Sequence, residues 1–220
     1  MQTLVFDIET GPLPQAEIEA MLPAFNPMDV KLGNVKDPDK IAAKLREAEA
    51  NHVGDFIKRA ALDATTGRVV AIGIVDFDGG EDIGIIGHDE ERDTIAGFWS
   101  FARGDQGRMN QLVGFNITQF DLPFLIRRSW KLGVPVPPGL RRGRYWSDQV
   151  VDVRDAWQLG DRYAAGSLDA IAKHLGFPGK TGDGAAFAEL WATDRPAAEA
   201  YLRNDVDLTA RIAARLNAVG

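Results

Sequence analysis

The sequence predicts an α/β fold in which a mixed β-sheet carries helices on both faces. Apolar runs of strand length alternate with longer helical segments, and two of the runs are joined by Asp78-Gly79-Gly80, a strong hairpin signal. The resulting order is strand, hairpin, helix, strand, helix, strand and then helices. An antiparallel hairpin is thus combined with strands that helical crossovers deliver, which is typical of a mixed sheet.

The sheet is expected to have five strands. Residues 3–8 form a β-branched and aromatic run that Gly11 and Pro12 end. The later segments of strand character are 67–78, 81–89, 112–116 and 149–153.

Helices are expected at 37–62, 89–101, 119–132, 167–175, 185–191 and 196–218. The first is rich in helix formers and has Pro38 near its start, and Gly54 is the residue where we expect it to break. The third is expected to begin at Pro123, because proline is tolerated only in the first turn of a helix. The length fits a single domain over residues 1–220, with the segment at about 37–62 as a helical insertion.

The composition excludes several classes of protein. The chain has no cysteine, which excludes a disulfide framework, a thiolate zinc site and a cysteine nucleophile. The N-terminus carries no basic leader, and no apolar stretch approaches the ~20 residues that cross a bilayer. We therefore expect a cytoplasmic protein without a membrane partner. The net charge of −7 argues against a non-specific basic coat for nucleic acid.

One segment departs from this acidic balance. Residues 122–147 contain no acid, and Trp130, Tyr145 and Trp146 are interleaved with basic side chains. The basic residues are Arg127, Arg128, Lys131, Arg141, Arg142 and Arg144. The segment is either a solvated helix and loop whose tryptophans pack in the core or, beside an acidic site, a surface for single-stranded nucleic acid. In the second case, neutralising the last three arginines together would weaken binding of single-stranded DNA.

Two acids lie at the end of the first strand. Asp7 and Glu9 are two residues apart, so their side chains project from the same side of the strand. Two unpaired carboxylates this close raise each other's pKa unless a cation neutralises them. Mg²⁺ and Mn²⁺ prefer such oxygen ligands, so a divalent metal site is one interpretation and a solvated strand end is the other.

Three further polar residues lie where they could join that pair. Asp121 opens a helix just after a short strand, at the strand end where α/β sheets gather ligands, although a first-turn acid also favours the helix dipole. Tyr201 and Asp205 are four apart in the last helix and share one of its faces. Taken alone, each pattern also fits an ordinary core or surface residue.

In combination, these patterns resemble the three exonuclease motifs of the DEDD (DnaQ-like) superfamily. The motifs are DxE at Asp7 and Glu9, NxxxxD at Asn116 and Asp121, and YxxxD at Tyr201 and Asp205. The sister branch has a histidine five residues before its last aspartate, and this chain has Ala200 there, so the resemblance is to the DEDDy branch. The exonuclease domains of family B DNA polymerases look most similar. The resemblance implies an RNase H-like fold.

The resemblance also implies two divalent metal ions, Mg²⁺ or Mn²⁺, and a water that attacks the terminal phosphodiester. By position, Asp7 would bridge both ions. Glu9 and Asp205 would hold the ion that binds the attacking water, and Asp121 would hold the other. Tyr201 would orient that water through its hydroxyl.

The substrate contacts that the resemblance implies are less regular. Thr10, Gly11 and Leu13 follow DxE, where the family's turn contacts the terminal nucleotide, but the sequence GPLP departs from the usual turn. Asn116 would lie near the substrate and Lys180 would approach a phosphate. The alternatives are that Asn116 caps the following helix and that Lys180 is only solvated.

The expected function is therefore removal of nucleoside monophosphates from the 3′ end of single-stranded DNA by a free-standing 3′–5′ exonuclease. Such an enzyme could work beside a separate polymerase or repair protein. The alternatives are a 3′–5′ exoribonuclease similar to RNase D and a non-catalytic nucleic-acid-binding relative with the same fold. Asp152 is assigned a structural role, because Asp205 fits the tyrosine spacing and Asp152 does not.

Overall fold

The computed structural model describes residues 1–80, 82–104, 108–140, 146–161, 163–164, 166–182 and 184–219. The chain forms two compact units. The sheet unit comprises Met1–Thr10 and Val69–Gly220, and the helical unit comprises Gly11–Arg68. Each unit is described by itself.

A mixed five-stranded sheet is the centre of the sheet unit, as the sequence predicted. Its strands are β1 (Thr3–Pro12), β2 (Gly67–Asp76), β3 (Gly84–Ile86), β4 (Gln111–Gly114) and β5 (Val150–Asp152). Their order across the sheet is β3-β2-β1-β4-β5. β2 and β3 are antiparallel, whereas β1, β4 and β5 run parallel with Val5 opposite Val113 and Val113 opposite Val151.

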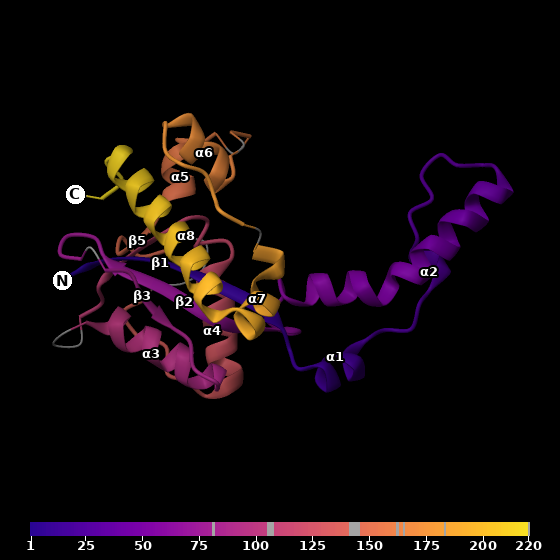
Figure 1. Ribbon diagram of the computed structural model, residues 1–220, viewed down its shortest axis with the longest axis horizontal. Coiled ribbons are helices and arrows are strands. Elements are labelled where there is room, and N and C mark those ends of the chain that lie inside the picture. The colour runs from indigo at the N-terminus through magenta and orange to yellow at the C-terminus, as the bar shows by residue number, and fades with distance from the viewer. Residues whose placement is uncertain are drawn as a thin grey trace. The chain divides into compact units, whose positions relative to one another are not determined.

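Helices cover both faces of this sheet (Figure 1). They are α3 (Glu91–Arg103), α4 (Asp121–Leu132), α5 (Val153–Gln158), α6 (Leu168–His174), α7 (Phe187–Thr193) and α8 (Arg195–Arg215). Helices α5 to α8 share one core cluster with Val5 and Val113. α3 packs on the opposite face, where the ring centroids of Phe98 and Phe6 are 4.8 Å apart.

The alternation of side chains along β1 decides which face carries the acids. Val5 belongs to the core cluster of α8, and Phe6 faces α3. With a period of two, Asp7 and Glu9 lie on the same face as Val5, toward α8. Gly73 of β2 lets this helix approach closely, because a Cβ atom there would lie 2.7 Å from a Val206 methyl carbon. The last helix is therefore held directly over the acidic end of β1.

The helical unit contains α1 (Gln15–Met21), a 3-10 turn (Pro27–Asp29) and α2 (Pro38–Ala60). The Asp37 carboxylate caps α2 by accepting from the Asp39 amide at 2.9 Å. The predicted break at Gly54 is wrong, since α2 runs through that residue without interruption. A single glycine costs a helix only about 1 kcal/mol, which the helix formers around it offset.

Two short helices were not predicted, and one predicted helix begins at a different residue. The missed helices are α1 and α5, which are seven and six residues long. α4 begins at Asp121, two residues before Pro123. A proline is tolerated there because the amides of the first turn have no partner within the helix. In the described part of the chain, no helix is long and apolar enough to cross a membrane.

Candidate active site

Three carboxylates from β1 and α8 meet in the sheet unit. Asp7, Glu9 and Asp205 each offer an oxygen atom within 4.8 Å of the other two. The side chains of Glu9 and Asp205 are only 7% and 1% exposed. β1 supplies two of the acids because of its alternation, and α8 supplies the third from the helix that lies over it.

Burial and mutual repulsion make these acids hard to ionise. Burial, and then the charge of Asp205, raises the pKa of Asp7 to about 7. Burial, followed by the charges of Asp7 and Asp205, raises the pKa of Glu9 well above its usual value. The cluster therefore lacks the positive charge that would keep all three carboxylates ionised at neutral pH.

Lys180 brings one positive charge to this cluster. Its ammonium nitrogen lies 2.5 Å from Oδ2 of Asp205. Lys180 lies in a glycine-rich loop, residues 176–184, that follows α6. Its backbone amide donates to Oδ1 of Asp169 at 2.9 Å, which ties this loop to α6. Burial acts to lower the pKa of Lys180, but Asp205 and the Tyr201 hydroxyl beside it raise the pKa above its usual value. Lys180, predicted to approach a phosphate, contacts an acid of the cluster.

Asp121 is fixed beside the same strand. Its Oδ1 accepts a hydrogen bond at 3.2 Å from the backbone amide of Ile8, between Asp7 and Glu9 in sequence. Burial and the charge of Asp7 raise the pKa of Asp121, and the bond from Ile8 opposes them. Asp121 is 3% exposed, so it adds another buried acid near the partly buried Asp7.

Tyr201 lies one helical turn before Asp205. Its hydroxyl and Oδ1 of Asp205 are buried and fall short of hydrogen-bond geometry with every residue that the structure describes, although the Lys180 ammonium lies beside that hydroxyl. The ring centroid of Phe187 lies 5.9 Å from that of Tyr201, and the Lys180 ammonium lies 5.2 Å from the tyrosine centroid. Burial, and then the nearby acids, raises the pKa of Tyr201, so its hydroxyl stays protonated.

Asn116 and Asp152 are engaged with each other and with Arg154. Asn116 has a left-handed backbone with φ of 63°, and its Oδ1 accepts from the Arg154 guanidinium at 2.8 Å. The Asp152 carboxylate accepts from the Asn116 amide at 2.8 Å and from both the amide and the hydroxyl of Thr118. These bonds hold the β4–α4 turn onto β5, which agrees with the structural role predicted for Asp152. The Asn116 side chain does not cap α4.

The residues predicted to contact the terminal nucleotide, Thr10, Gly11 and Leu13, fall on both sides of the unit boundary. Thr10 is the last residue of the first segment of the sheet unit and is 9% exposed. Gly11 and Leu13 belong to the helical unit, where the Leu13 amide donates to the Thr66 carbonyl at 2.9 Å. Leu13 packs in the small core of that unit. The substrate contacts of these residues stay predictions.

The basic segment is described only in part. Arg141, Arg142, Arg144 and Tyr145 lie outside the described residues. Arg128 is 4% exposed and pairs with Glu91 at 2.6 Å, so it is a structural residue and not part of a binding surface. Trp130, expected in the core under one interpretation, is 63% exposed.

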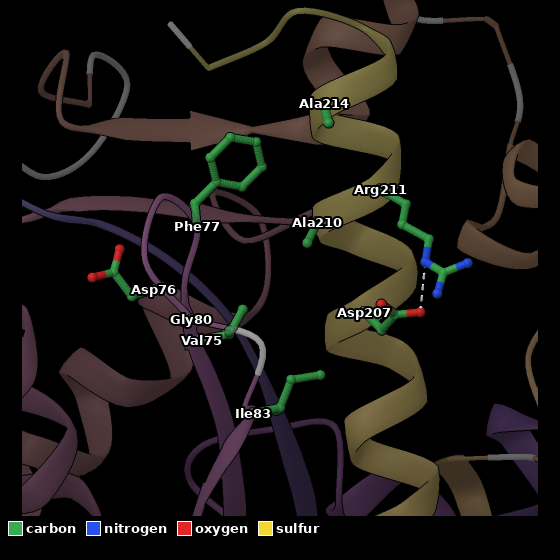
Figure 2. Close-up of a pocket in the computed structure, with 9 residues that line it drawn as sticks. All are labelled: Val75, Asp76, Phe77, Gly80, Ile83, Asp207, Ala210, Arg211 and Ala214. Atoms are coloured by element: carbon green, nitrogen blue, oxygen red, sulfur yellow. Dashed lines mark ion pairs between the residues drawn. The ribbon is translucent and has the colours of Figure 1, made fainter.

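A separate pocket of ≈410 Å³ lies between the β2–β3 turn and the last turns of α8 (Figure 2). Arg211 and Asp207 on one side of it form an ion pair at 2.8 Å. The Phe77 amide at this pocket bonds to the carbonyl of Thr3, at the start of β1. None of Asp7, Glu9 and Asp205 lines this pocket, so it is not part of the acidic cluster.

Three residues that lie against Tyr201 were not predicted from the sequence. Gly182 and Gly184 face Tyr201 from the glycine-rich loop, and Phe187 of α7 packs against its ring. The glycines are a signal in themselves, because residues 176–184 include four of them, but no local pattern shows what a loop will contact.

Comparison with known proteins assigns the chain to a family. Residues 59–210 match the family described as predicted 3′–5′ exonucleases related to the exonuclease domain of PolB. The chain belongs to this family, as its motifs predicted. The matched segment includes Asp121, Tyr201 and Asp205, whereas Asp7 and Glu9 precede it. No curated protein matches the sequence.

A solved structure with the same fold is that of the family B DNA polymerase from the hyperthermophilic archaeon Pyrobaculum calidifontis. The match has a TM-score of 0.65 and 21% sequence identity. It covers 99% of this chain and 24% of the polymerase, so the chain spans about a quarter of that protein. At this identity the match establishes the fold, which is the RNase H-like arrangement that the resemblance implied.

Proposed function

We propose that this protein is a metal-dependent 3′–5′ exonuclease of the DEDDy type that acts on the 3′ end of single-stranded DNA. The observation that carries the proposal is the meeting of Asp7, Glu9 and Asp205 beside a buried Tyr201 hydroxyl without a described partner. The family assignment supports the direction of cleavage, and the relation to PolB supports DNA as the polymer.

The donor set fits divalent metal ions. The oxygens of Asp7, Glu9 and Asp205 are close enough to share a cation, and the raised pKa values mark a deficit of positive charge. Oδ1 of Asp205 has no bond among the described residues and is available as a ligand. These residues, with Asp121, would hold two ions, Mg²⁺ or Mn²⁺. When bound, such ions stabilise the negative charge that develops on a phosphodiester during in-line displacement.

The chain's own residues would prepare the attack. The Tyr201 hydroxyl would hold the attacking water, and the packing around its ring fixes the direction of that hydrogen bond. The water oxygen bonds to phosphorus while the bond from phosphorus to the 3′ oxygen breaks. One proton of the water ends on that 3′ oxygen. The products are a nucleoside 5′-monophosphate and a strand shortened by one nucleotide.

Substrate binding would use Lys180, Asn116 and residues that follow Glu9 along the chain. Lys180 would contact the terminal phosphate, because its ammonium group lies at the Asp205 carboxylate, one of the residues that would hold a metal ion. Thr10, Gly11 and Leu13 would contact the terminal nucleotide, and Asn116 would lie near it.

The test uses single-stranded DNA and RNA oligonucleotides labelled at the 5′ or at the 3′ end. We expect release of labelled mononucleotide from 3′-labelled DNA, stepwise shortening of 5′-labelled DNA, and loss of both with a chelator. Asp205→Asn should lose activity, whereas Asp207→Asn, two residues along α8 in an exposed ion pair, should keep it. Cleavage of RNA but not DNA would overturn the substrate. Absence of metal-dependent shortening from either 3′ end would overturn the enzyme.

A further inference from the structure

Gly184 faces the gap between Tyr201 and Glu9. A Cβ atom at Gly184 would lie 3.4 Å from the Tyr201 hydroxyl oxygen and 3.6 and 4.0 Å from the two carboxylate oxygens of Glu9. The position of that Cβ atom is therefore only slightly farther than hydrogen-bonding distance from both the Tyr201 hydroxyl and the Glu9 carboxylate. No side chain of Gly184 fills that point.

The polar atoms around this point have bonding capacity that a small polar molecule could use. The Tyr201 hydroxyl and Oδ1 of Asp205, one turn apart on α8, are buried and fall short of hydrogen-bond geometry with every described residue, and the Lys180 ammonium beside them is paired with Oδ2 of Asp205. Buried polar groups without protein partners are usually bonded to an ordered water. The Glu9 carboxylate on the opposite side can accept the proton that such a water donates.

The tyrosine ring cannot readily move away from this point. A Cβ atom at Gly182 would lie 2.9 and 3.2 Å from two carbons of the Tyr201 ring, so the loop backbone is already pressed against it. The Phe187 ring packs against the same tyrosine, with the centroids 5.9 Å apart. An atom added at Gly184 would therefore occupy the space of a water molecule. Rotation of the Tyr201 ring could not make room for both.

We propose that Gly184 is a positioning residue: its missing side chain keeps open the space between the Tyr201 hydroxyl and the Glu9 carboxylate in which the attacking water is held. This inference rests on the proposed exonuclease function. An alanine at this position is compatible with folding, because the backbone of Gly184 is outside the left-handed region and the added methyl group would make ordinary van der Waals contacts. The methyl group would exclude the water.

The kinetic test compares Gly184→Ala with wild type on 5′-labelled single-stranded DNA. We expect kcat to fall by about 10- to 100-fold, as for a misplaced reactant, and KM to stay within about twofold. Gly54→Ala is the matched glycine control, since Gly54 has no atom within 4 Å of an added Cβ. An unchanged kcat in Gly184→Ala, or a fall caused only by a higher KM, would overturn the inference.

A double-mutant cycle with Tyr201→Phe asks whether both residues act through the same water. If they do, the double variant should be no slower than the slower single variant within about threefold. Rate losses that multiply would mean that Gly184 and Tyr201 act independently, which contradicts the proposal.

A crystal structure of each protein provides a readout that does not depend on turnover. Wild type should contain an ordered water bonded to both the Tyr201 hydroxyl and the Glu9 carboxylate, and Gly184→Ala should lack it. A wild type without this water overturns the inference even if the protein is an exonuclease. A wild type with the water but without nuclease activity overturns the proposed function alone.

Discussion

Replacing Asp7 with asparagine should make the metal-free protein more stable than wild type at neutral and alkaline pH. Burial, and then the charge of Asp205, raises the pKa of Asp7 from 3.8 to about 7. In the unfolded chain the carboxyl ionises near its ordinary pKa, whereas in the folded protein it keeps its proton until the pH passes about 7. The folded state therefore loses stability as the pH rises from about 4 through 7.

The size of this loss follows from the two pKa values. One pKa unit corresponds to about 1.4 kcal/mol, so ionising Asp7 in the folded protein costs up to about 4 kcal/mol. Asparagine has a similar shape and no charge, and it avoids this cost at every pH. The difference in unfolding free energy between Asp7→Asn and wild type should therefore grow by about 4 kcal/mol between pH 4 and pH 8.

The assay is urea unfolding followed by circular dichroism, with chelator present, at several pH values from 4 to 8.5. Asp207→Asn is the control, because that carboxylate is 40% exposed in an ion pair with Arg211. Its replacement should change stability by less than about 1 kcal/mol. A wild type and an Asp7→Asn variant whose stabilities follow the same pH dependence would refute the electrostatic account of the cluster.

Three further predictions follow from other contacts. Mn²⁺ at a hundred times its dissociation constant should stabilise wild type by about 2.7 kcal/mol and raise Tm by about 5 to 10 °C in a thermal-shift assay, and Asp205→Asn should lose this rise. Glu91→Gln should lower the urea-derived stability by about 3 kcal/mol, because it leaves the buried Arg128 guanidinium without its carboxylate; a loss below 1 kcal/mol would contradict this. Gly73→Ala should cost about 1 to 3 kcal/mol in the same measurement, since its Cβ would collide with side chains of α8; an unchanged midpoint would show that the helix can shift.

The order of strands and helices along the chain could be predicted, because apolar runs of strand length alternate with helical segments and are separated by turn signals. β2 runs over Gly67–Asp76 within the expected segment, and β4 and β5 lie where the short apolar runs occur. The extent of a strand is less predictable, because pairing decides it. β1 continues beyond its apolar run to Pro12, and β3 is only three residues long because it pairs only with Ile72–Ile74.

The candidate acids could be located for a similar reason. Asp7 and Glu9 share a face by the two-residue period of a strand, and Tyr201 and Asp205 share a face by the turn of a helix. These are local relations that spacing determines. That β1 and α8 meet face to face depends instead on the packing of α8 over Gly73, which no local pattern contains.

The contact of Lys180 with Asp205 could not be predicted from local sequence patterns. This contact depends on Asp169 of α6, which holds the glycine-rich loop by its backbone. The lysine neutralises part of the charge of Asp205, yet burial and the remaining repulsion still raise the pKa of Asp7 to about 7. One ammonium group is therefore not enough for these buried carboxylates. Divalent cations would supply the charge that is missing, so the same electrostatic deficit that destabilises the metal-free fold favours metal binding.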